Sequence, residues 1–214
     1  MTKHIQVQLH SIAKIVTLDH SLSRVDYLQA QKQAIYVFRD HLIGQFFEID
    51  VNDQIKKTEH GKPYLSDYPN YAFNHTHSRN YYAIAMSQDI QDIGVDIEEM
   101  SRRVRFDALA QHAFHSDEIQ QWHDLDQDPE YWFKVWTTKE AVLKASGLGI
   151  RLNLNELNTC IHPEYDGGIC EHERIGVFAF QNYKISDCML TVAWRTEHSC
   201  KGFALPQIQI HSEL

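Results

Sequence analysis

The chain has 214 residues and 43% of them are hydrophobic, which is enough for a packed core in one large domain or two small ones. Lys and Arg total 20 against 29 Asp and Glu, and the formal net charge of −9 argues against a nucleic-acid-binding protein. No apolar run approaches the roughly 20 residues of a transmembrane helix, so we expect no membrane association.

Cysteine and histidine spacing argues against a disulfide framework or a zinc site. Residues 1–6 lack the apolar stretch of a secretion signal, so we expect a cytoplasmic protein with reduced thiols. The histidine pairs His75 and His77, and His112 and His115, lack further ligands at zinc-site spacing, which favours structural or surface roles. No Cys-x-x-Cys pair occurs among the cysteines, which are Cys160, Cys170, Cys188 and Cys200.

The first part of the sequence predicts short strands around one long helix. The helix is predicted because Ile35, Phe38 and Leu42 recur on one face. In chain order, we expect a strand at 5–9, the helix at about 29–47, a turn at 61–63 that enters a short strand, and a hairpin of strands 73–77 and 81–87 joined by residues 78–80.

A further strand, predicted at residues 94–98, carries two acids on one face. Side chains two apart in a strand point to the same side, so Asp96 and Glu98 can bind one cation together. Val95 and Ile97 alternate with them and point to the opposite side. The pattern predicts one buried and one acidic face.

Helices and strands mixed without strict βαβ alternation favour an α+β fold. The polar, basic segment around Arg102 predicts a junction between an N-terminal half, residues 1–101, and a C-terminal half, residues 102–214. Beyond this junction we expect helices at 106–114 and 116–122, the second capped by Ser116, and strands at 176–180 and 189–194.

The helix with the clearest end signals follows Asp128. Asp128 is a good N-cap residue, Pro129 suits the first helical position, and Gly147 or Gly149 can end the helix. One face of this helix begins apolar and ends charged, since its residues recur every four positions. These residues are Trp132, Trp136, Glu140 and Lys144.

Each acidic feature has an ordinary interpretation when taken alone. Glu140 and Lys144 fit a surface helix pair worth about 0.3–0.5 kcal/mol, and Asp96 and Glu98 fit the solvated face of an edge strand. Together, however, the three carboxylates supply the oxygen ligands of a Mg²⁺-phosphate site. Because they come from opposite sides of the predicted junction, we expect the site at the interface of the two halves.

Four blocks of sequence between residues 61 and 149 form an ordered set. They are GKP at 61–63, FNHTHS at 73–78, GVDIE at 94–98 and WTTKEAVLKA at 136–145. In order and spacing this set resembles the signature of the 4′-phosphopantetheinyl transferases, in their longer, monomeric form. The resemblance implies an α+β fold of two similar α/β halves related by pseudo-two-fold symmetry.

The resemblance also implies an activity and its participants. The expected enzyme transfers the 4′-phosphopantetheine arm of coenzyme A to a serine of an apo acyl or peptidyl carrier protein and releases adenosine 3′,5′-bisphosphate. Mg²⁺ is the implied cofactor, coenzyme A the implied substrate, and a monomer the implied form.

Individual residues receive roles through the same resemblance. Asp96, Glu98 and Glu140 would hold Mg²⁺ on the pyrophosphate, which suits a reaction that depends on positioning and charge stabilisation. Glu140, or a water that it orients, would be the base for the serine. The implied contacts with coenzyme A are Lys62, His77, Ser78, Lys139 and Lys144, and of these His77 and Lys144 are also implied to be catalytic.

The sequence departs from the family pattern in two places. His75 stands where an apolar side chain is usual in the second block, so we expect that position to be less buried. The basic residues that grip the 3′-phosphate in the family are poorly matched, and the candidates are Arg24, Lys32 and Arg39.

Two other functions account for part of the pattern. A non-catalytic carrier-protein or coenzyme A binding module would keep the blocks without transferring anything. A Mg²⁺-dependent phosphohydrolase would use the carboxylates but leave the block at 61–63 and His77 unexplained. If a carrier protein is the partner, its acidic surface is expected to face a basic cluster, for which the candidates are Arg102, Arg103 and Arg105.

Overall fold

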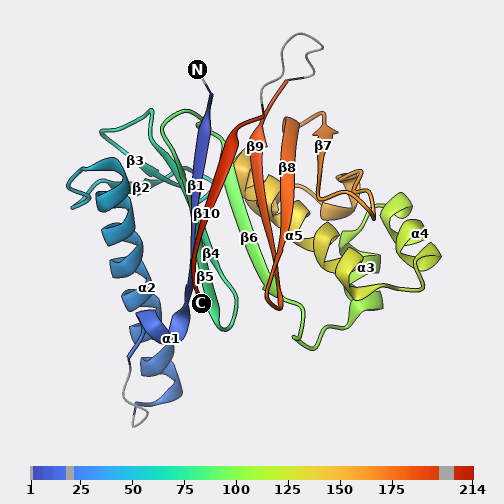
Figure 1. Ribbon diagram of the computed structural model, residues 1–214, viewed down its shortest axis with the longest axis horizontal. Coiled ribbons are helices and arrows are strands. Elements are labelled where there is room, and N and C mark those ends of the chain that lie inside the picture. Colours follow the sequence, from blue (N-terminus) through green and yellow to red (C-terminus); the bar gives the residue numbers. More distant parts are fainter. Residues whose placement is uncertain (1, 18–21, 198–204) are drawn as a thin grey trace.

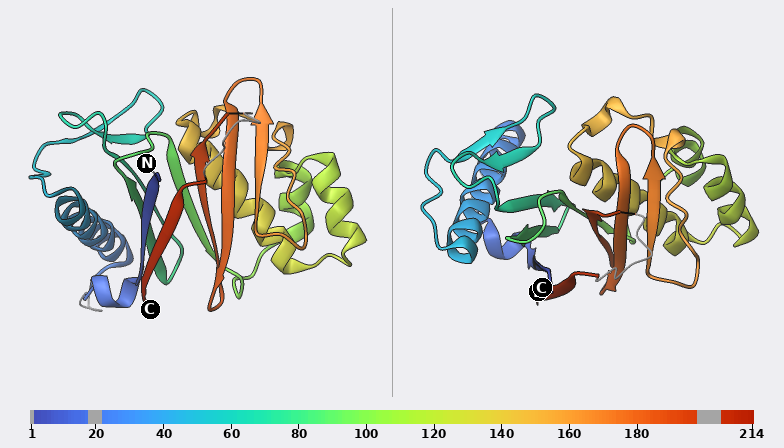
Figure 2. Two further views of the ribbon diagram at one scale, coloured as in Figure 1. Left: turned by 45° about the horizontal axis from the view of Figure 1, so that its top comes forward. Right: turned by 90° about the horizontal axis from the view of Figure 1, so that it is seen from above.

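The computed structural model describes residues 2–17, 22–197 and 205–214 (Figure 1). Within these ranges the chain forms two four-stranded sheets and a two-stranded ribbon, with helices at both ends of the molecule (Figure 2). The predicted α+β fold class is confirmed. Every helix in the described ranges is too short or too polar to cross a bilayer.

The first sheet has the strand order β10-β1-β5-β4, in which β1 is parallel to β10 and antiparallel to β5. Helix α2 packs on it through Ile35, Leu42 and Phe47, which share one core cluster with Phe73 and Tyr82. The predicted strand at 5–9 corresponds to β1, and the predicted hairpin to β4 and β5, so both predictions are confirmed. The elements of this part are β1 (His4–Ser11), α1 (Ile12–Ile15), α2 (Arg24–Phe47), β2 (Ile55–Lys57), β3 (Pro63–Leu65), β4 (Ala72–His77), β5 (Tyr81–Ser87) and β10 (Gln207–Glu213).

The second sheet is antiparallel and has the order β6-β9-β8-β7. Helix α5 covers one face of it, and α3 and α4 lie beyond α5 (Figure 1). The elements are β6 (Ile93–Glu99), α3 (Phe106–Ala113), α4 (Ser116–Asp124), α5 (Pro129–Ser146), the 3₁₀ helices η1 (Gly149–Arg151) and η2 (Leu154–Glu156), β7 (Gly167–His172), β8 (Gly176–Ile185) and β9 (Cys188–Arg195).

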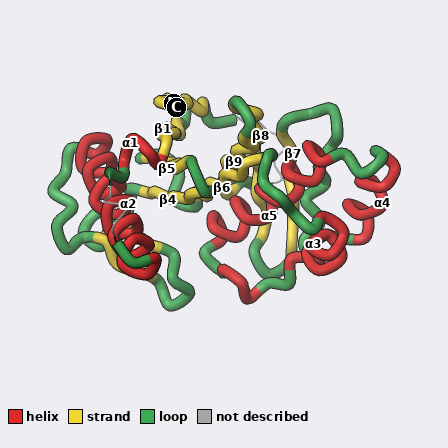
Figure 3. Tube along the Cα trace, turned by 90° about the horizontal axis from the view of Figure 1, so that it is seen from below, coloured by secondary structure: helices red, strands yellow, loops and turns green. Residues whose placement is uncertain are grey.

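The two sheets meet where β4 lies beside β6 (Figure 3). The Asn74 side-chain oxygen accepts a hydrogen bond from the Val95 backbone N–H at 2.9 Å, which joins the two strands. Each sheet also contains a strand from across residue 101, because β6 belongs to the second sheet and β10 to the first. The division at residue 101 and the pseudo-two-fold relation stay predictions, supported by the long helix on each sheet.

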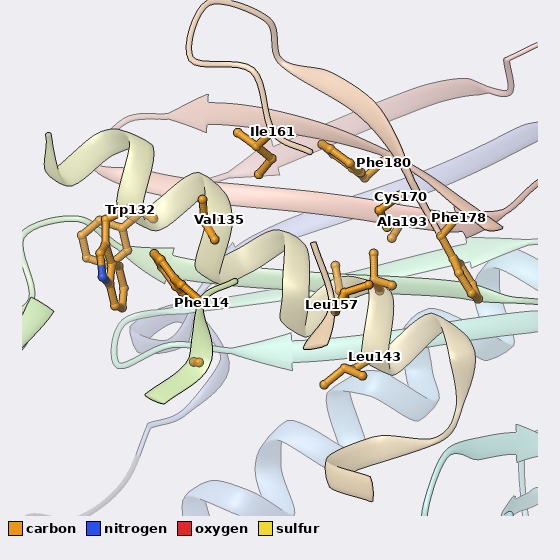
Figure 4. Packing of buried hydrophobic residues seen from close by; sticks show 14 of the residues in the cluster. Phe114, Trp132, Val135, Leu143, Leu157, Ile161, Cys170, Phe178, Phe180 and Ala193 are labelled. Carbon is orange, nitrogen blue, oxygen red and sulfur yellow. The ribbon is translucent and has the colours of Figure 1, made fainter. Parts of the chain in front are cut away.

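The end signals of α5 act as predicted. The Asp128 carboxylate accepts hydrogen bonds from the backbone N–H groups of Glu130 and Tyr131, and Pro129 is the first helical residue. Gly147 ends the helix with a φ of 72°, a left-handed conformation that glycine adopts without strain. The apolar side of α5 packs into a core with residues of α3, β7, β8 and β9 (Figure 4).

Several elements differ from the sequence-based prediction. Helix α2 begins at Arg24, capped by the Ser23 hydroxyl, rather than near residue 29. The prediction that Ser116 caps α4 is wrong, because His115 is the N-cap: its ring accepts from the Asp117 N–H while Glu118 accepts from the His115 N–H. Strands β2, β7 and β10 were not predicted.

The sequence predicted reduced cysteines. Cys160, Cys170 and Cys188 are free thiols, the first exposed and the other two buried. Burial raises the pKa of the Cys170 thiol to about 12, so this group stays protonated at neutral pH. Cys200 lies outside the described residues.

Candidate functional site

The site is built where β6 lies against α5, and Gly94 makes this close approach possible. A Cβ atom on Gly94 would lie 2.0 Å from the Ala141 carbonyl oxygen and 2.6 Å from the Ala145 nitrogen, both backbone atoms of α5. Asp96 and Glu98 follow Gly94 at intervals of two and also face α5, as expected for one face of a strand.

Asp96 is 5% exposed, and its two carboxylate oxygens have different surroundings. Oδ1 accepts hydrogen bonds from Lys144 Nζ at 2.6 Å and from Thr76 Oγ1 at 3.0 Å. Oδ2 is buried without a hydrogen-bond partner. A buried carboxylate oxygen with no donor is costly, so this atom is available to a ligand with positive charge.

Lys144 is fixed in place by three acceptors. Besides Asp96 Oδ1, its Nζ donates to Thr76 Oγ1 at 2.9 Å and to the Val95 carbonyl oxygen at 3.2 Å. Thr76 therefore accepts from the lysine while it donates to the aspartate. The lysine side chain remains 28% exposed, so it can still meet a ligand.

Both carboxylate oxygens of Glu98 already have partners. Oε1 accepts from Trp136 Nε1 at 3.2 Å, and Oε2 accepts from an Arg102 guanidinium nitrogen at 2.5 Å. Burial, and next the negative charge of Asp96, raises the pKa of Glu98 above its ordinary value. A second cation near these acids would therefore favour the ionised form.

Glu140 lies on α5 one turn before Lys144. The pKa of Glu140 is raised above its ordinary value, mainly by burial and next by the negative charge of Asp96. Among the described residues, none donates a hydrogen bond to Glu140 or forms an ion pair with it. The structure places Lys144 against Asp96, and the charge of Asp96 acts on both Glu98 and Glu140. A common cation for the three acids stays a prediction.

The positions and the free coordination sites of the carboxylate oxygens decide whether these acids fit a divalent cation. In the described ranges, no three His, Cys, Asp or Glu side chains form a group that could hold a metal ion in their present positions. The donor set nevertheless fits Mg²⁺, which prefers carboxylate oxygens. Asp96 Oδ2 is unpartnered, and a cation would offset both the burial and the repulsion by Asp96 that raise the pKa of Glu98 and Glu140.

A cavity of about 660 Å³ opens beside Glu140 and Lys144. One wall comes from the turn before β3 and from β4, and the other from the end of α5 and the segment through η2. Elements packed on the first sheet and elements packed on the second sheet therefore line the same cavity. Ligand clefts are common at such interfaces. The lining includes His60, Lys62, Pro63, His75, His112 and Asn153.

Lys62 lines this cavity and also supports the end of α5. Its Nζ donates to the Ala145 carbonyl oxygen at 2.6 Å and lies 3.8 Å from Asp92. The carbonyls at the end of a helix lack intrahelical partners, so the lysine satisfies one of them. Burial lowers the pKa of Lys62.

The structure does not bring Lys139 to the cavity. This lysine is fully buried in the core, where it forms an ion pair with Glu118 at 2.7 Å and donates to the Leu154 carbonyl oxygen at 2.9 Å. Its direction along α5 differs from that of Glu140, because adjacent helical residues point about 100° apart. Lys139 is therefore not part of the proposed site.

Ser78 and His77 lie at the end of β4, outside the cavity lining. The Ser78 hydroxyl donates to Glu99 Oε1 at 2.9 Å, a carboxylate that also binds Asn80 and closes the hairpin loop. His77 is exposed, and its Nδ1 lies 3.2 Å from the Ser78 carbonyl oxygen. Its contact with a phosphate stays a prediction.

The basic candidates for the 3′-phosphate lie on α2, away from the cavity lining. Arg39 pairs with Asp40 at 2.7 Å and lies 4.6 Å from the Tyr36 ring centre, and Lys32 lies over the same ring. Arg24 is exposed at the start of the helix. Their role in phosphate binding also stays a prediction.

His75 is half-buried between buried neighbours, and its Nδ1 is buried without a partner. Its ring contacts the rings of Tyr36 and Tyr82 at centroid distances of 6.1 and 5.9 Å. Burial, and next the positive charges of Arg39 and Lys144, lowers the pKa of His75 to about 3. The folded protein therefore holds this histidine neutral.

Replacing His75 by isoleucine is expected to make the protein more resistant to acid. In the unfolded chain the pKa is near 6.5, so between pH 6.5 and 3 the unfolded state binds one more proton and stability falls as the pH falls. This loss amounts to about 2 kcal/mol at pH 5. Urea unfolding at pH 7 and at pH 5 measures the difference in unfolding free energy between the two pH values. The control His41→Gln, at an exposed position, should show the same difference as the wild type. If His75→Ile also shows the wild-type difference, the expectation is contradicted.

Sequence reasoning missed three residues that hold the acids in place. They are Thr76, which joins Asp96 to Lys144, and Arg102 and Trp136, which bind Glu98. Each lies in a segment that the sequence singled out, but their contacts depend on how β4, β6 and α5 meet.

Comparison with known proteins points to one family. The sequence profile described as "4'-phosphopantetheinyl transferase superfamily" matches residues 92–189, which include all three acids and Lys144. Relatives include the 4′-phosphopantetheinyl transferase Sfp of Bacillus subtilis, 29% identical over 58% of this chain and 54% of its own length. The transferase psf-1 of Bacillus pumilus is 32% identical over 54% of this chain and 49% of its own.

A third relative is the 4′-phosphopantetheinyl transferase HetI of Nostoc, 34% identical over 48% of this chain and 45% of its own length. The chain thus spans about half the length of the curated relatives it matches. The profile match covers the region that carries the carboxylates and α5. Over residues 92–189 the chain matches the 4′-phosphopantetheinyl transferase superfamily.

Proposed function

We propose that this protein transfers the 4′-phosphopantetheine arm of coenzyme A to a serine of an apo acyl or peptidyl carrier protein. The observation that carries the proposal is that Glu140 and Lys144 line a cavity of about 660 Å³ while Lys144 pairs with the buried Asp96. A cavity of this size suits a ligand with the dimensions of a cofactor. The protein would act as a monomer in the cytoplasm.

In this reaction the serine oxygen bonds to the phosphorus atom that carries the pantetheine arm. The bond between that phosphorus and the oxygen bridging the two phosphates breaks, and adenosine 3′,5′-bisphosphate leaves. The serine loses one proton. Transfer of this kind depends on positioning and on stabilising charge on the phosphate oxygens.

Asp96, Glu98 and Glu140 would hold Mg²⁺, which supplies charge neutralisation on the pyrophosphate when bound. Asp96 offers its unpartnered Oδ2 for this purpose. Lys144, fixed by Thr76 and Asp96, would donate to an oxygen of the departing phosphate.

Glu140 is the proposed proton acceptor, directly or through a water. It has no hydrogen bond or ion pair within the described ranges, and it lines the cavity. Its raised pKa makes its carboxylate a stronger base than an exposed one. Lys62 lines the same cavity and would contact the nucleotide end of coenzyme A, while His77 is proposed to contact a phosphate oxygen from the end of β4.

Incubating the protein with coenzyme A, Mg²⁺ and a panel of apo carrier proteins tests the proposal by intact mass. We expect at least one carrier to gain a phosphopantetheine arm, and chelation of Mg²⁺ with EDTA to stop the gain. Unmodified carriers throughout would support a binding module instead. Release of phosphate from coenzyme A without a carrier would support a phosphohydrolase.

A further inference from the structure

Arg102 holds one of the three acids of the site from outside. It follows β6 by three residues and pairs with Glu98 Oε2 at 2.5 Å, and its side chain is 37% exposed. Its backbone N–H is bonded to the Glu99 carbonyl oxygen at 3.1 Å, so the turn is anchored while the side chain reaches solvent. The guanidinium can therefore leave Glu98 without any change in the backbone.

The two cations that neutralise the acids differ in how firmly they are held. Lys144 Nζ has three acceptors from two strands, and it binds Asp96 Oδ1 while Oδ2 stays free. Arg102 has one side-chain acceptor in the described structure, Glu98. Asp96 thus has an unpaired oxygen with Lys144 in place, whereas Glu98 Oε2 is already paired with Arg102.

The second oxygen of Glu98 does not remove this conflict. Oε1 is occupied by the Trp136 indole N–H, which comes from α5 and is neutral. Rotating the carboxylate to free Oε1 would break the tryptophan contact and leave a partly buried indole donor without its partner. The exposed arginine is the partner whose loss costs less, because water replaces its hydrogen bond.

We propose that Arg102 competes with the divalent cation for Glu98: the guanidinium pairs with Oε2 in the free protein and is released to solvent when the ion binds. The inference rests on the proposed function only in taking Glu98 as a ligand of that ion. Arg102 is thus a positioning residue that lowers the affinity of the site for the cation.

Binding of Mn²⁺, followed by electron paramagnetic resonance without coenzyme A or carrier, tests the proposal. We expect Arg102→Gln to bind Mn²⁺ about threefold to tenfold more tightly than the wild type, since the ion no longer displaces an ion pair. Arg103→Gln is the matched control. Arg103 adjoins Arg102, its side chain is exposed, and it forms no ion pair with the described residues. The substitution removes the same charge and should change the affinity for Mn²⁺ less than about twofold.

Equal tightening in both variants would mean that only long-range charge acts, and weaker binding in Arg102→Gln would mean that Arg102 prepares Glu98 for the ion. Either result overturns the proposal. A second measurement follows the Arg102 Nε–H signal by nitrogen-15 NMR during a Mg²⁺ titration. It should move toward the solvent-exposed position as the site fills, and a signal that stays unchanged through saturation contradicts release.

Parallel transfer assays separate this inference from the proposed function. If the wild type modifies a carrier but the wild type, Arg102→Gln and Arg103→Gln bind Mn²⁺ equally tightly, the competition is refuted and the proposed transfer stands. Tighter Mn²⁺ binding in Arg102→Gln by a protein that modifies no carrier supports the competition and refutes the transfer. Absence of Mn²⁺ binding in every variant overturns the inference together with the cation site.

Discussion

Replacing Asp96 by asparagine is expected to reduce phosphopantetheine transfer by at least about 100-fold while the protein stays folded. Asparagine keeps an oxygen that accepts from Lys144 and Thr76, so the contacts of Oδ1 are preserved. It replaces the unpartnered Oδ2 by an amide NH₂ group that repels a cation. Initial rates of carrier modification at saturating coenzyme A measure the loss.

Asp53→Asn is a matched control for this variant. It makes the same chemical change and removes the same charge at an exposed position whose φ of 59° asparagine tolerates. We expect wild-type transfer from it, and unchanged thermal unfolding from both variants. Transfer by Asp96→Asn within a few-fold of the wild-type rate would remove Asp96 from the site.

Replacing Gly94 by alanine is expected to destabilise the protein by more than about 3 kcal/mol, or to prevent folding. The added Cβ would overlap the Ala141 carbonyl oxygen at 2.0 Å and crowd the Ala145 nitrogen at 2.6 Å. Both are backbone atoms of α5, so no side-chain rotation relieves the overlap. Strand and helix must separate, which also moves Asp96 away from Lys144.

Urea unfolding measures the effect of this change, with Gly44→Ala in α2 as the control. A Cβ there lies 3.2 Å from the Ile49 carbonyl oxygen, and alanine favours the helix, so we expect a change within about 1 kcal/mol. If Gly94→Ala unfolds at the wild-type urea concentration, close approach of β6 and α5 is not required for the fold.

Local signals explain which elements the sequence predicted well. Helix α5 begins at Asp128 and ends at Gly147 because capping is decided by residues within one turn. The acidic face of β6 followed from an alternation of period two. Its burial was not predicted, since the cover over Asp96 comes from α5, which is distant in sequence.

Long-range contacts explain what the sequence could not predict. The pairing of Lys139 with Glu118 joins α5 to α4, and Lys139 therefore turns into the core although it adjoins Glu140 in the sequence. The parallel pairing of β10 with β1 joins the two ends of the described chain. Neither spacing nor composition specifies such partners, and the same holds for Arg102 on Glu98.

A crystal structure grown with Mn²⁺ and coenzyme A tests most directly whether Asp96, Glu98 and Glu140 hold one divalent ion. We predict a single anomalous peak about 2.1 Å from an oxygen of each carboxylate, with the pyrophosphate of coenzyme A on its open side and Arg102 turned to solvent. A peak elsewhere, or three carboxylates whose oxygens share no common ion with coenzyme A bound, would contradict this account of the site.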